Sequence, residues 1–141
     1  MDHCDVCIFS AAPIKESTRL FFVNLNLYLY NVFGMSELAG PHTFSEPKAF
    51  KSLTSTEALK EAGMGLPGLQ VCIANPDAEG NGEICLRGRN SFMGYFKDEK
   101  NTRDTIDSKG FVHSGDVGYL NKDNVLSITG RIKELIITAG G

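Results

Sequence analysis

Residues 27–37 read Leu-Tyr-Leu-Tyr-Asn-Val-Phe-Gly-Met-Ser-Glu, and this stretch decides the fold class of the chain. Its first part is rich in the aromatic and β-branched side chains that favour strands, and Gly34 closes the run. A shorter β-prone run, Val6–Phe9, lies upstream, and Pro13 with the polar residues after it marks a helix start between the two runs. Strand, short helix and strand in such close succession predict a βαβ unit with parallel strands.

From Leu66 onward the sequence changes to short β-prone runs separated by clusters of turn residues. These runs are Leu69–Ala74, Glu83–Arg87, Gly110–His113, Val117–Asn121 and Val125–Thr129. Short strands at regular spacing are typical of an antiparallel sheet or a small barrel. Residues 38–65 are predicted to be rich in loops, with a helical turn at Glu57–Ala62, and Asp98–Thr105 to form a short surface helix. The predicted fold class is therefore α/β: the end of a parallel-sheet α/β subdomain, followed by a small antiparallel β subdomain or barrel.

The composition of the 141 residues is that of an ordinary globular protein, with 42% hydrophobic and 22% charged residues. Fourteen Lys and Arg against 17 Asp and Glu give a net charge of −3, which argues against a nucleic-acid-binding module. The sequence has no apolar run of the about 18 residues that a transmembrane helix requires. The 15 glycines exceed the usual share of about 7% and indicate turns, strands and ligand loops.

The four cysteines are predicted to be reduced residues of an intracellular protein. Cys4 and Cys7 form a lone C-x-x-C motif, and a zinc site would require a second pair at similar spacing. The N-terminus also lacks the basic and apolar regions of a signal peptide. These features predict a cytoplasmic location, which includes the cytosolic face of the endoplasmic reticulum.

Four local clusters contain residues suited to nucleotide chemistry. Phe33–Glu37 follows a predicted parallel strand, at the edge where α/β sheets bind ligands, and offers a ring for a base, a hydroxyl for a phosphate and a carboxylate for Mg²⁺. His113–Asp116 places an aspartate on a glycine-flanked turn, where it can accept both hydroxyls of a ribose. Gly130–Glu134 contains Arg131, whose planar fork can contact ribose or phosphate. Gly82–Gly88 by itself predicts a strand between two glycine turns.

Each cluster also has a purely structural interpretation, which the residues alone leave open. Phe33–Glu37 is also typical of a strand that leads into a polar turn. Asp116 can be a turn residue that bonds its own backbone, and Arg131 can belong to a solvated charged turn. His113 is predicted to be a packed or partly exposed strand residue rather than a base.

Taken in order, the four clusters resemble consecutive core motifs of the adenylate-forming enzymes, which include acyl-CoA synthetases, luciferases and peptide-synthetase adenylation domains. Ser10–Pro13 resembles the preceding adenine-loop motif, and Leu66–Val71 resembles another recurrent segment. The similarity extends from about residue 7 to residue 141. Two segments, Ser36–Thr43 and Lys133–Gly141, resemble the bubblegum-type long-chain fatty-acid–CoA ligases.

This resemblance implies an acid–thiol ligase that converts a carboxylate and ATP into acyl-AMP and pyrophosphate, and then transfers the acyl group to CoA. The expected partners are ATP and AMP, Mg²⁺, a fatty acid and CoA. A medium-chain or aryl-acid CoA ligase is the alternative within the superfamily, and a catalytically inactive nucleotide-binding fragment is another. Outside the family, a generic α/β nucleotide-binding module remains as an interpretation.

The resemblance also assigns roles to individual residues. The predicted ATP and AMP contacts are Ala11 and Ala12 at the adenine edge, Phe33 stacked on the base, Gly34, Met35, Ser36 at a phosphate, Asp116 at the ribose hydroxyls and Arg131 at ribose or phosphate. Ser36 and Glu37 are the predicted catalytic residues, with Glu37 as the Mg²⁺ ligand. Lys133 is expected at a hinge, and Gly140 and Gly141 near CoA.

The motifs divide the chain into three predicted parts. Residues 1–65 are expected to be the C-terminal part of the large AMP-binding subdomain, residues 66–130 the small β subdomain, and residues 131–141 the hinge and the start of a C-terminal domain. The family's phosphate loop, acyl tunnel and adenylation lysine are expected outside this stretch. The chain is therefore predicted to be an internal fragment, truncated at the hinge, that is inactive in isolation. Ser10 stands where the family usually has glycine, which would introduce strain if its backbone had to be left-handed.

Overall fold

The computed structural model describes residues 6–11, 14–27, 29–45 and 61–132. The first half contains β1 (Cys7–Ser10), α1 (Glu16–Asn24), β2 (Leu29–Met35), a 3₁₀ turn η1 (Ser36–Leu38), β3 (Gly40–Phe44) and β4 (Glu61–Gly65). The second half contains β5 (Gln70–Ala74), β6 (Gly82–Arg87), α2 (Glu99–Thr105), β7 (Val112–Leu120) and β8 (Leu126–Arg131).

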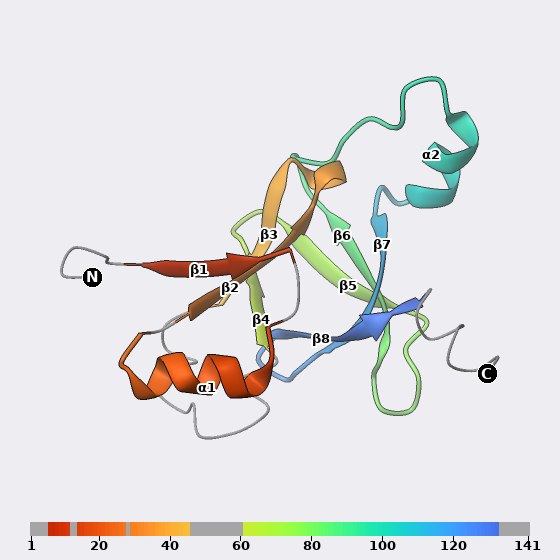
Figure 1. Cartoon of the computed structure of the whole chain (residues 1–141). Coiled ribbons are helices and arrows are strands. Elements are labelled where there is room, and N and C mark those ends of the chain that lie inside the picture. Colours follow the sequence, from red (N-terminus) through yellow and green to blue (C-terminus); the bar gives the residue numbers. More distant parts are fainter. Residues whose placement is uncertain (1–5, 12–13, 28, 46–60, 133–141) are drawn as a thin grey trace, which may run out of the picture.

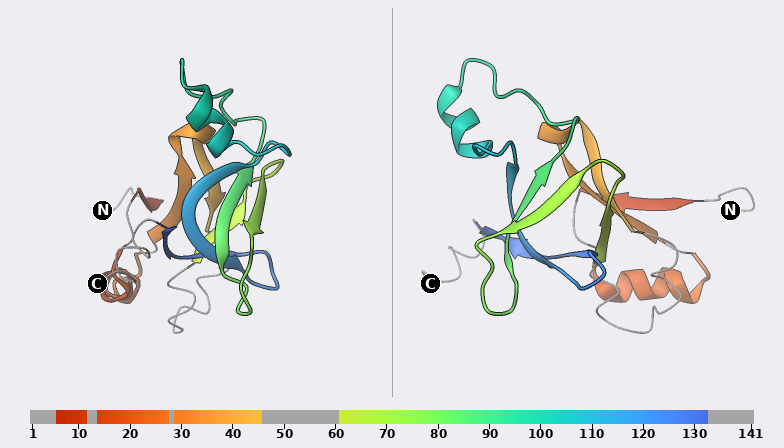
Figure 2. Two further views of the ribbon diagram at one scale, coloured as in Figure 1. Left: turned by 90° about the vertical axis from the view of Figure 1, so that its right-hand side faces the viewer. Right: turned by 180° about the vertical axis from the view of Figure 1, so that it is seen from behind.

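All eight described strands belong to one open sheet, in the order β1-β2-β3-β4-β8-β7-β6-β5 (Figure 1). β1 and β2 pair in parallel, with α1 as the crossover between them, and the other neighbours pair antiparallel. The predicted α/β class, with a βαβ unit followed by an antiparallel sheet, is therefore confirmed. β7 curves strongly in the side view, which bends the antiparallel part of the sheet around its inner face (Figure 2).

Two strands lie where loops were predicted. β3 pairs with β2, and β4 pairs with both β3 and β8. Pairing with strands that are distant in the sequence therefore stabilises β3 and β4 as strands, although both segments contain glycine. Of the predicted helical turn at 57–62, residues 57–60 lie outside the described residues, while Glu61 and Ala62 belong to β4. The predicted strands at 110–113 and 117–121 are one continuous strand, β7.

The core lies on one face of the antiparallel sheet. Its six fully buried members come from η1 and the central strands: Leu38, Ala62, Ile84, Leu86, Val112 and Leu126. Ile84 and Leu86 alternate with Cys85 in β6, so they share a face of the sheet, as the period of two in a strand requires. Burial of each leucine, isoleucine or valine side chain in this set contributes about 1.5–3 kcal/mol before conformational entropy is counted.

The two α-helices of the described residues pack against different parts of the sheet. α1 packs against β2, and α2 packs against β7, where Asp98 caps α2 by accepting a hydrogen bond from the Asn101 N–H at 3.1 Å (Figure 1). The predicted surface helix at 98–105 is thus confirmed. No helix within the described residues is long and apolar enough to cross a membrane.

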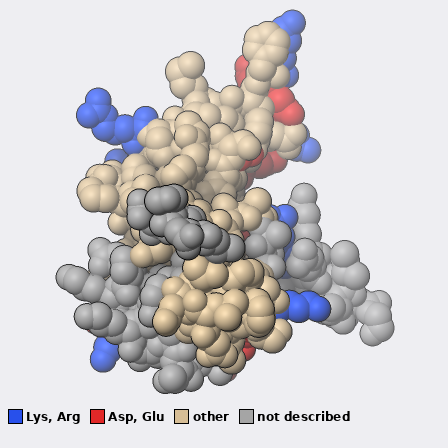
Figure 3. All heavy atoms as spheres, turned by 60° about the vertical axis from the view of Figure 1, so that its left-hand side comes forward, with Lys and Arg blue, Asp and Glu red and all other residues tan. Residues whose placement is uncertain are grey.

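The strand β1 forms one edge of the sheet, and apolar side chains are exposed there. Ile8 is 58% exposed and Phe21 of α1 is 59% exposed. On the face shown in Figure 3, uncharged residues occupy most of the described surface, while Lys and Arg side chains lie at its periphery. Ile8 and Phe21 therefore present apolar side chains at this edge.

Candidate nucleotide-binding site

The parallel pair β1–β2 places two of the predicted nucleotide-binding segments side by side. The register pairs Ser10 with Val32, so Ala11 follows β1 at the level of Phe33 in β2. The Ser10 hydroxyl donates a hydrogen bond to the Val32 carbonyl at 2.7 Å. Ser10 itself has extended backbone in β1, whereas Ala11 has a φ of +71°, so the left-handed residue of this turn is the one after the substituted position. Ala12 lies outside the described residues.

Gly34 is required by the packing of β2 against β3. A Cβ at this position would lie 2.3 Å from the carbonyl oxygen of Gly40, a distance that no side chain can occupy. The pairing between β2 and β3 also shifts register between Phe33 and Gly34. Gly34 therefore allows the β3 backbone to lie close to β2. The predicted contact of Gly34 with a nucleotide stays a prediction.

Ser36 and Glu37 lie in η1, immediately after β2, and Glu37 is held by a loop from the second half of the chain. The Tyr95 hydroxyl donates a hydrogen bond to Glu37 Oε1 at 2.6 Å. The Phe92 N–H donates to the Glu37 carbonyl at 2.7 Å, and the Asn90 side-chain amide donates to the Leu38 carbonyl at 2.6 Å. These bonds fix both the backbone and the carboxylate of the predicted Mg²⁺ ligand.

Tyr95 is a residue that the sequence analysis did not identify. Its hydrogen bond to Glu37 raises the pKa of Tyr95 above the usual value, so the hydroxyl stays protonated and donates at neutral pH. The aromatic run around Gly94 is a weak signal in the sequence, and nothing in it indicates a contact with a carboxylate 58 positions away. Phe92 packs edge-on against the Tyr95 ring at 4.9 Å between centroids and supports its position.

Asp116 and Arg131 face each other across β7 and β8. Their register pairs the two residues directly, and Arg131 Nε donates to Asp116 Oδ1 at 2.8 Å. The Asp116 side chain is 13% exposed and the Arg131 side chain is 64% exposed, so the carboxylate lies in the sheet surface while the guanidinium extends into solvent. Both residues lie in strands rather than in the predicted turns. Gly115, with a φ of +73°, supplies the local bend before Asp116.

The backbone around Asp116 is held by the neighbouring strand β6. The Asp116 N–H donates to Ser114 Oγ at 3.0 Å, and the Ser114 hydroxyl donates to the Ile84 carbonyl at 2.7 Å. The Gly115 N–H donates to Glu83 Oε1 at 3.1 Å. His113 lies partly exposed in β7 beside Glu83, as predicted for a strand histidine. The strand predicted at 82–88 is β6.

The structure thus collects the described site residues into two groups. Ala11, Phe33, Gly34, Met35, Ser36 and Glu37 lie at the end of the parallel pair, and Asp116 and Arg131 lie on the antiparallel hairpin. The predicted hinge residue Lys133 and the predicted CoA-proximal Gly140 and Gly141 lie outside the described residues.

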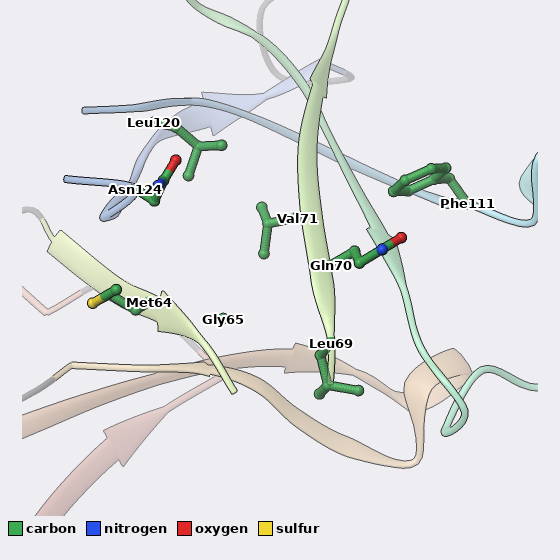
Figure 4. Close-up of a pocket in the computed structure, with 8 residues that line it drawn as sticks. All are labelled: Met64, Gly65, Leu69, Gln70, Val71, Phe111, Leu120 and Asn124. Carbon is green, nitrogen blue, oxygen red and sulfur yellow. The ribbon is translucent and has the colours of Figure 1, made fainter. Parts of the chain in front are cut away.

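A pocket of about 540 Å³ lies elsewhere, between β4, β5 and the end of β7 (Figure 4). Its lining residues are Met64, Gly65, Leu69, Gln70, Val71, Phe111, Leu120 and Asn124. Val71 stands at its centre, with Leu120 and Asn124 on one side and Phe111 on the other. Since these lining residues include none of the predicted nucleotide contacts, this pocket is separate from the candidate site.

Comparison with known proteins gives consistent matches. The family model described as "AMP-binding enzyme" matches residues 1–96. The long-chain-fatty-acid–CoA ligase ACSBG2 of Gallus gallus is 48% identical over 141 residues, which is 100% of this chain and 18% of that protein. The long-chain-fatty-acid–CoA ligase ACSBG1 of Homo sapiens is 47% identical over 138 residues, or 98% of this chain and 18% of that protein.

Solved structures show the same fold. O-succinylbenzoate coenzyme A synthetase from Bacillus subtilis, in complex with ATP and magnesium ion, matches with a TM-score of 0.78 at 21% identity, over 99% of this chain and 30% of that chain. The fatty acyl CoA synthetase of Mycobacterium tuberculosis matches with a TM-score of 0.69 at 21% identity, over 89% of this chain and 25% of that chain.

Proposed function

This chain belongs to the AMP-binding enzyme family, and we propose that it is part of an ATP-dependent long-chain fatty-acid–CoA ligase. The single observation that carries this proposal is the 48% identity to such a ligase over all 141 residues. The chain spans 18% of the length of that relative, so the proposed activity is that of the longer protein. Its reaction joins a fatty acid to ATP with release of pyrophosphate, and then transfers the acyl group from AMP to the CoA thiol.

The chemistry of this reaction requires a good leaving group and a neutralised phosphate. A carboxylate is a poor electrophile because its carbonyl carbon is electron-rich, and linkage to AMP makes it reactive. Attack of the carboxylate on the α-phosphate brings negative charges together, which fixed hydrogen-bond donors and cations must offset. In this proposal Ser36 provides a hydroxyl to the phosphates, because it is exposed directly after β2 and follows the ring of Phe33 by three residues.

The charged pair on the hairpin is suited to a ribose. A carboxylate has acceptor sites on both oxygens, so Asp116 can receive hydrogen bonds from both ribose hydroxyls and still pair with Arg131. The low exposure of Asp116 and its backbone anchorage favour a fixed acceptor. Arg131 is exposed enough to turn toward a phosphate or a ribose while it screens the Asp116 charge.

Glu37 is the residue proposed to hold Mg²⁺. Mg²⁺ prefers carboxylate oxygens, and the fit here is supported by the hydrogen bond from Tyr95, which fixes one oxygen of the carboxylate and so orients the other. When bound, Mg²⁺ supplies positive charge against the phosphates. The roles of the hinge and of CoA, and the location of the protein in the cytoplasm or at the cytosolic face of the endoplasmic reticulum, remain predictions from the sequence.

Pyrophosphate exchange into ATP tests this function in the full-length protein that contains the chain. We expect exchange that depends on Mg²⁺ and is fastest with long-chain acids such as palmitate, when the acids are compared at equal free concentration. Exchange that is fastest with a medium-chain or an aryl acid would favour the alternative ligase specificity. Nucleotide binding without exchange for any acid would contradict a ligase.

A further inference from the structure

A row of metal-ligating side chains crosses the outer face of the antiparallel sheet. Cys72 in β5 pairs with Cys85 in β6, and Cys85 pairs with His113 in β7. Cys85 alternates with the core residues Ile84 and Leu86, so this row lies on the face opposite the core. Glu83, two residues before Cys85 in the same strand, points to the same face. Cys72, the Glu83–Cys85 pair and His113 come from three different strands, and the strand register brings them together.

The distances place three of these side chains within reach of one ion. The ligand atoms of Glu83, Cys85 and His113 all lie within 4.8 Å of one another. Cys85 Sγ lies 3.5 Å from His113 Nδ1, and His113 Nδ1 lies 2.7 Å from Glu83 Oε2. Cys85 is 1% exposed, while the side chains of His113 and Glu83 are 30% and 22% exposed. The group therefore has a buried sulfur with a partly open imidazole and carboxylate above it.

We propose that Glu83, Cys85 and His113 form a binding site for a thiophilic divalent cation of the zinc class. Sulfur and imidazole donors favour Zn²⁺ over Mg²⁺, so this site differs in ligand chemistry from the nucleotide site. Three protein ligands leave a fourth tetrahedral position for water or another small ligand. None of its ligands is a proposed nucleotide contact, so the argument for this site does not rest on the proposed ligase activity.

The geometry fits a tetrahedral ion with limited rearrangement. Zn–S and Zn–N bonds of about 2.3 and 2.0 Å place the sulfur and nitrogen about 3.5 Å apart, which is the separation found between Cys85 and His113. The imidazole–carboxylate separation in such a site is about 3.3 Å. The 2.7 Å distance between His113 and Glu83 is that of a hydrogen bond, so the metal takes the place of the shared proton and these two side chains separate by about 0.6 Å.

Proton balance sets the conditions for binding. The Cys85 thiol releases its proton to solvent when the Sγ–metal bond forms. The proton that His113 Nδ1 shares with Glu83 moves through solvent to Nε2, so that Nδ1 can bind the ion. Glu83 stays oriented during this exchange, because its other oxygen, Oε1, accepts the Gly115 N–H at 3.1 Å. This hydrogen bond positions Glu83, as groups behind metal ligands usually do.

Cobalt titration of the 141-residue chain tests this proposal, in a background where Cys4→Ser and Cys7→Ser remove the separate C-x-x-C motif. Co²⁺ is expected to bind in one equivalent with the intense thiolate-to-metal absorption and visible bands of a tetrahedral site, and one equivalent of Zn²⁺ is expected to abolish both. The Cys85→Ser substitution is expected to remove the thiolate absorption, and His113→Gln to weaken binding by about tenfold or more.

Cys72→Ser is the matched control, because the Cys72 thiol contacts Cys85 on the same face but lies outside the group of three ligands. This variant is expected to keep the thiolate absorption. Absence of that absorption in the background protein would overturn the proposal, and so would its persistence after Cys85→Ser. If Cys85→Ser fails to fold, as judged by circular dichroism, His113→Gln decides: unchanged Co²⁺ affinity in that variant overturns the site.

Discussion

The Asp116→Asn substitution tests the ribose-binding half of the candidate site. Asparagine has the same shape as aspartate but no charge, and it offers one acceptor oxygen in place of two. Two hydrogen bonds hold the backbone at this position: the Asp116 N–H donates to Ser114 Oγ, and the Ser114 hydroxyl donates to the Ile84 carbonyl. Neither bond involves the substituted atoms. The substitution should therefore change the contacts with a ligand more than the fold.

The expected effect on AMP binding follows from the hydrogen bonds that are exchanged. Two bonds from ribose hydroxyls to a carboxylate are worth about 1.5 kcal/mol each, and one bond to a neutral amide about 1 kcal/mol. The net loss is about 2 kcal/mol, which corresponds to an AMP affinity lower by about 30-fold. The ion pair with Arg131 is also lost. Because Arg131 is 64% exposed, this loss lowers the free energy of unfolding by only about 0–1 kcal/mol.

Isothermal titration calorimetry of AMP with the full-length protein measures this effect, and thermal unfolding measures stability in parallel. Asp123→Asn is the matched control, since Asp123 lies exposed in the turn between β7 and β8. We expect an affinity loss in the first variant alone. An unchanged dissociation constant for Asp116→Asn would refute the ribose assignment, and a large fall in unfolding temperature would show that the residue acts mainly in the fold.

Four further substitutions test the fold and the site. Gly63→Ala, with a φ of +90° and a Cβ 2.1 Å from the β3 backbone, should lower the free energy of unfolding by about 3 kcal/mol in denaturant titrations. Gly68→Ala, with a φ of +81° in open space, should cost only about 1 kcal/mol, and equal losses would contradict this packing explanation. Tyr95→Phe should raise the Mg²⁺ concentration needed for half-maximal pyrophosphate exchange by about tenfold, because one charge-assisted hydrogen bond to Glu37 is lost. An unchanged Mg²⁺ dependence would argue against Glu37 as a ligand. Burial lowers the pKa of His42 in the folded protein. On acidification the unfolded chain therefore takes up a proton at His42 at a higher pH than the folded protein does. The free energy of unfolding is thus at its full value above the usual histidine pKa and falls as the pH drops through the lowered pKa. Stability should therefore decline more steeply on acidification in the wild type than in His42→Gln, and parallel pH profiles would exclude this linkage.

The sequence was sufficient to predict the βαβ unit and most of the antiparallel strands. In these segments the runs of hydrophobic residues and the turn residues between them indicate the same elements. It was not sufficient for β3 and β4, whose glycines and proline are typical of loops and whose strand form depends on partners far along the chain. Two strands were predicted in place of β7, because the glycine-flanked residues around Asp116 were interpreted as a turn. The structure instead keeps one strand, with a register shift between Val117 and Gly118 in its pairing with β8.

The candidate site was predictable residue by residue but not in its contacts. Family motifs identified Asp116 and Arg131 separately, and only the strand register shows that they form an ion pair. The hydrogen bond between Tyr95 and Glu37 depends on how the loop at 88–98 packs over η1, which no local pattern encodes. The cluster of Glu83, Cys85 and His113 was not predicted, because these strand residues do not have the sequence spacing of a known metal-binding motif.

Isotope transfer from the fatty acid tests the central claim most directly. The full-length protein is incubated with palmitate carrying ¹⁸O in both carboxylate oxygens, together with ATP, Mg²⁺ and CoA, and the products are examined by mass spectrometry. If the carboxylate attacks the α-phosphate, the released AMP carries one ¹⁸O atom and palmitoyl-CoA keeps the other. Formation of ADP with ¹⁸O in inorganic phosphate, or of AMP without ¹⁸O, would contradict an adenylate-forming ligase.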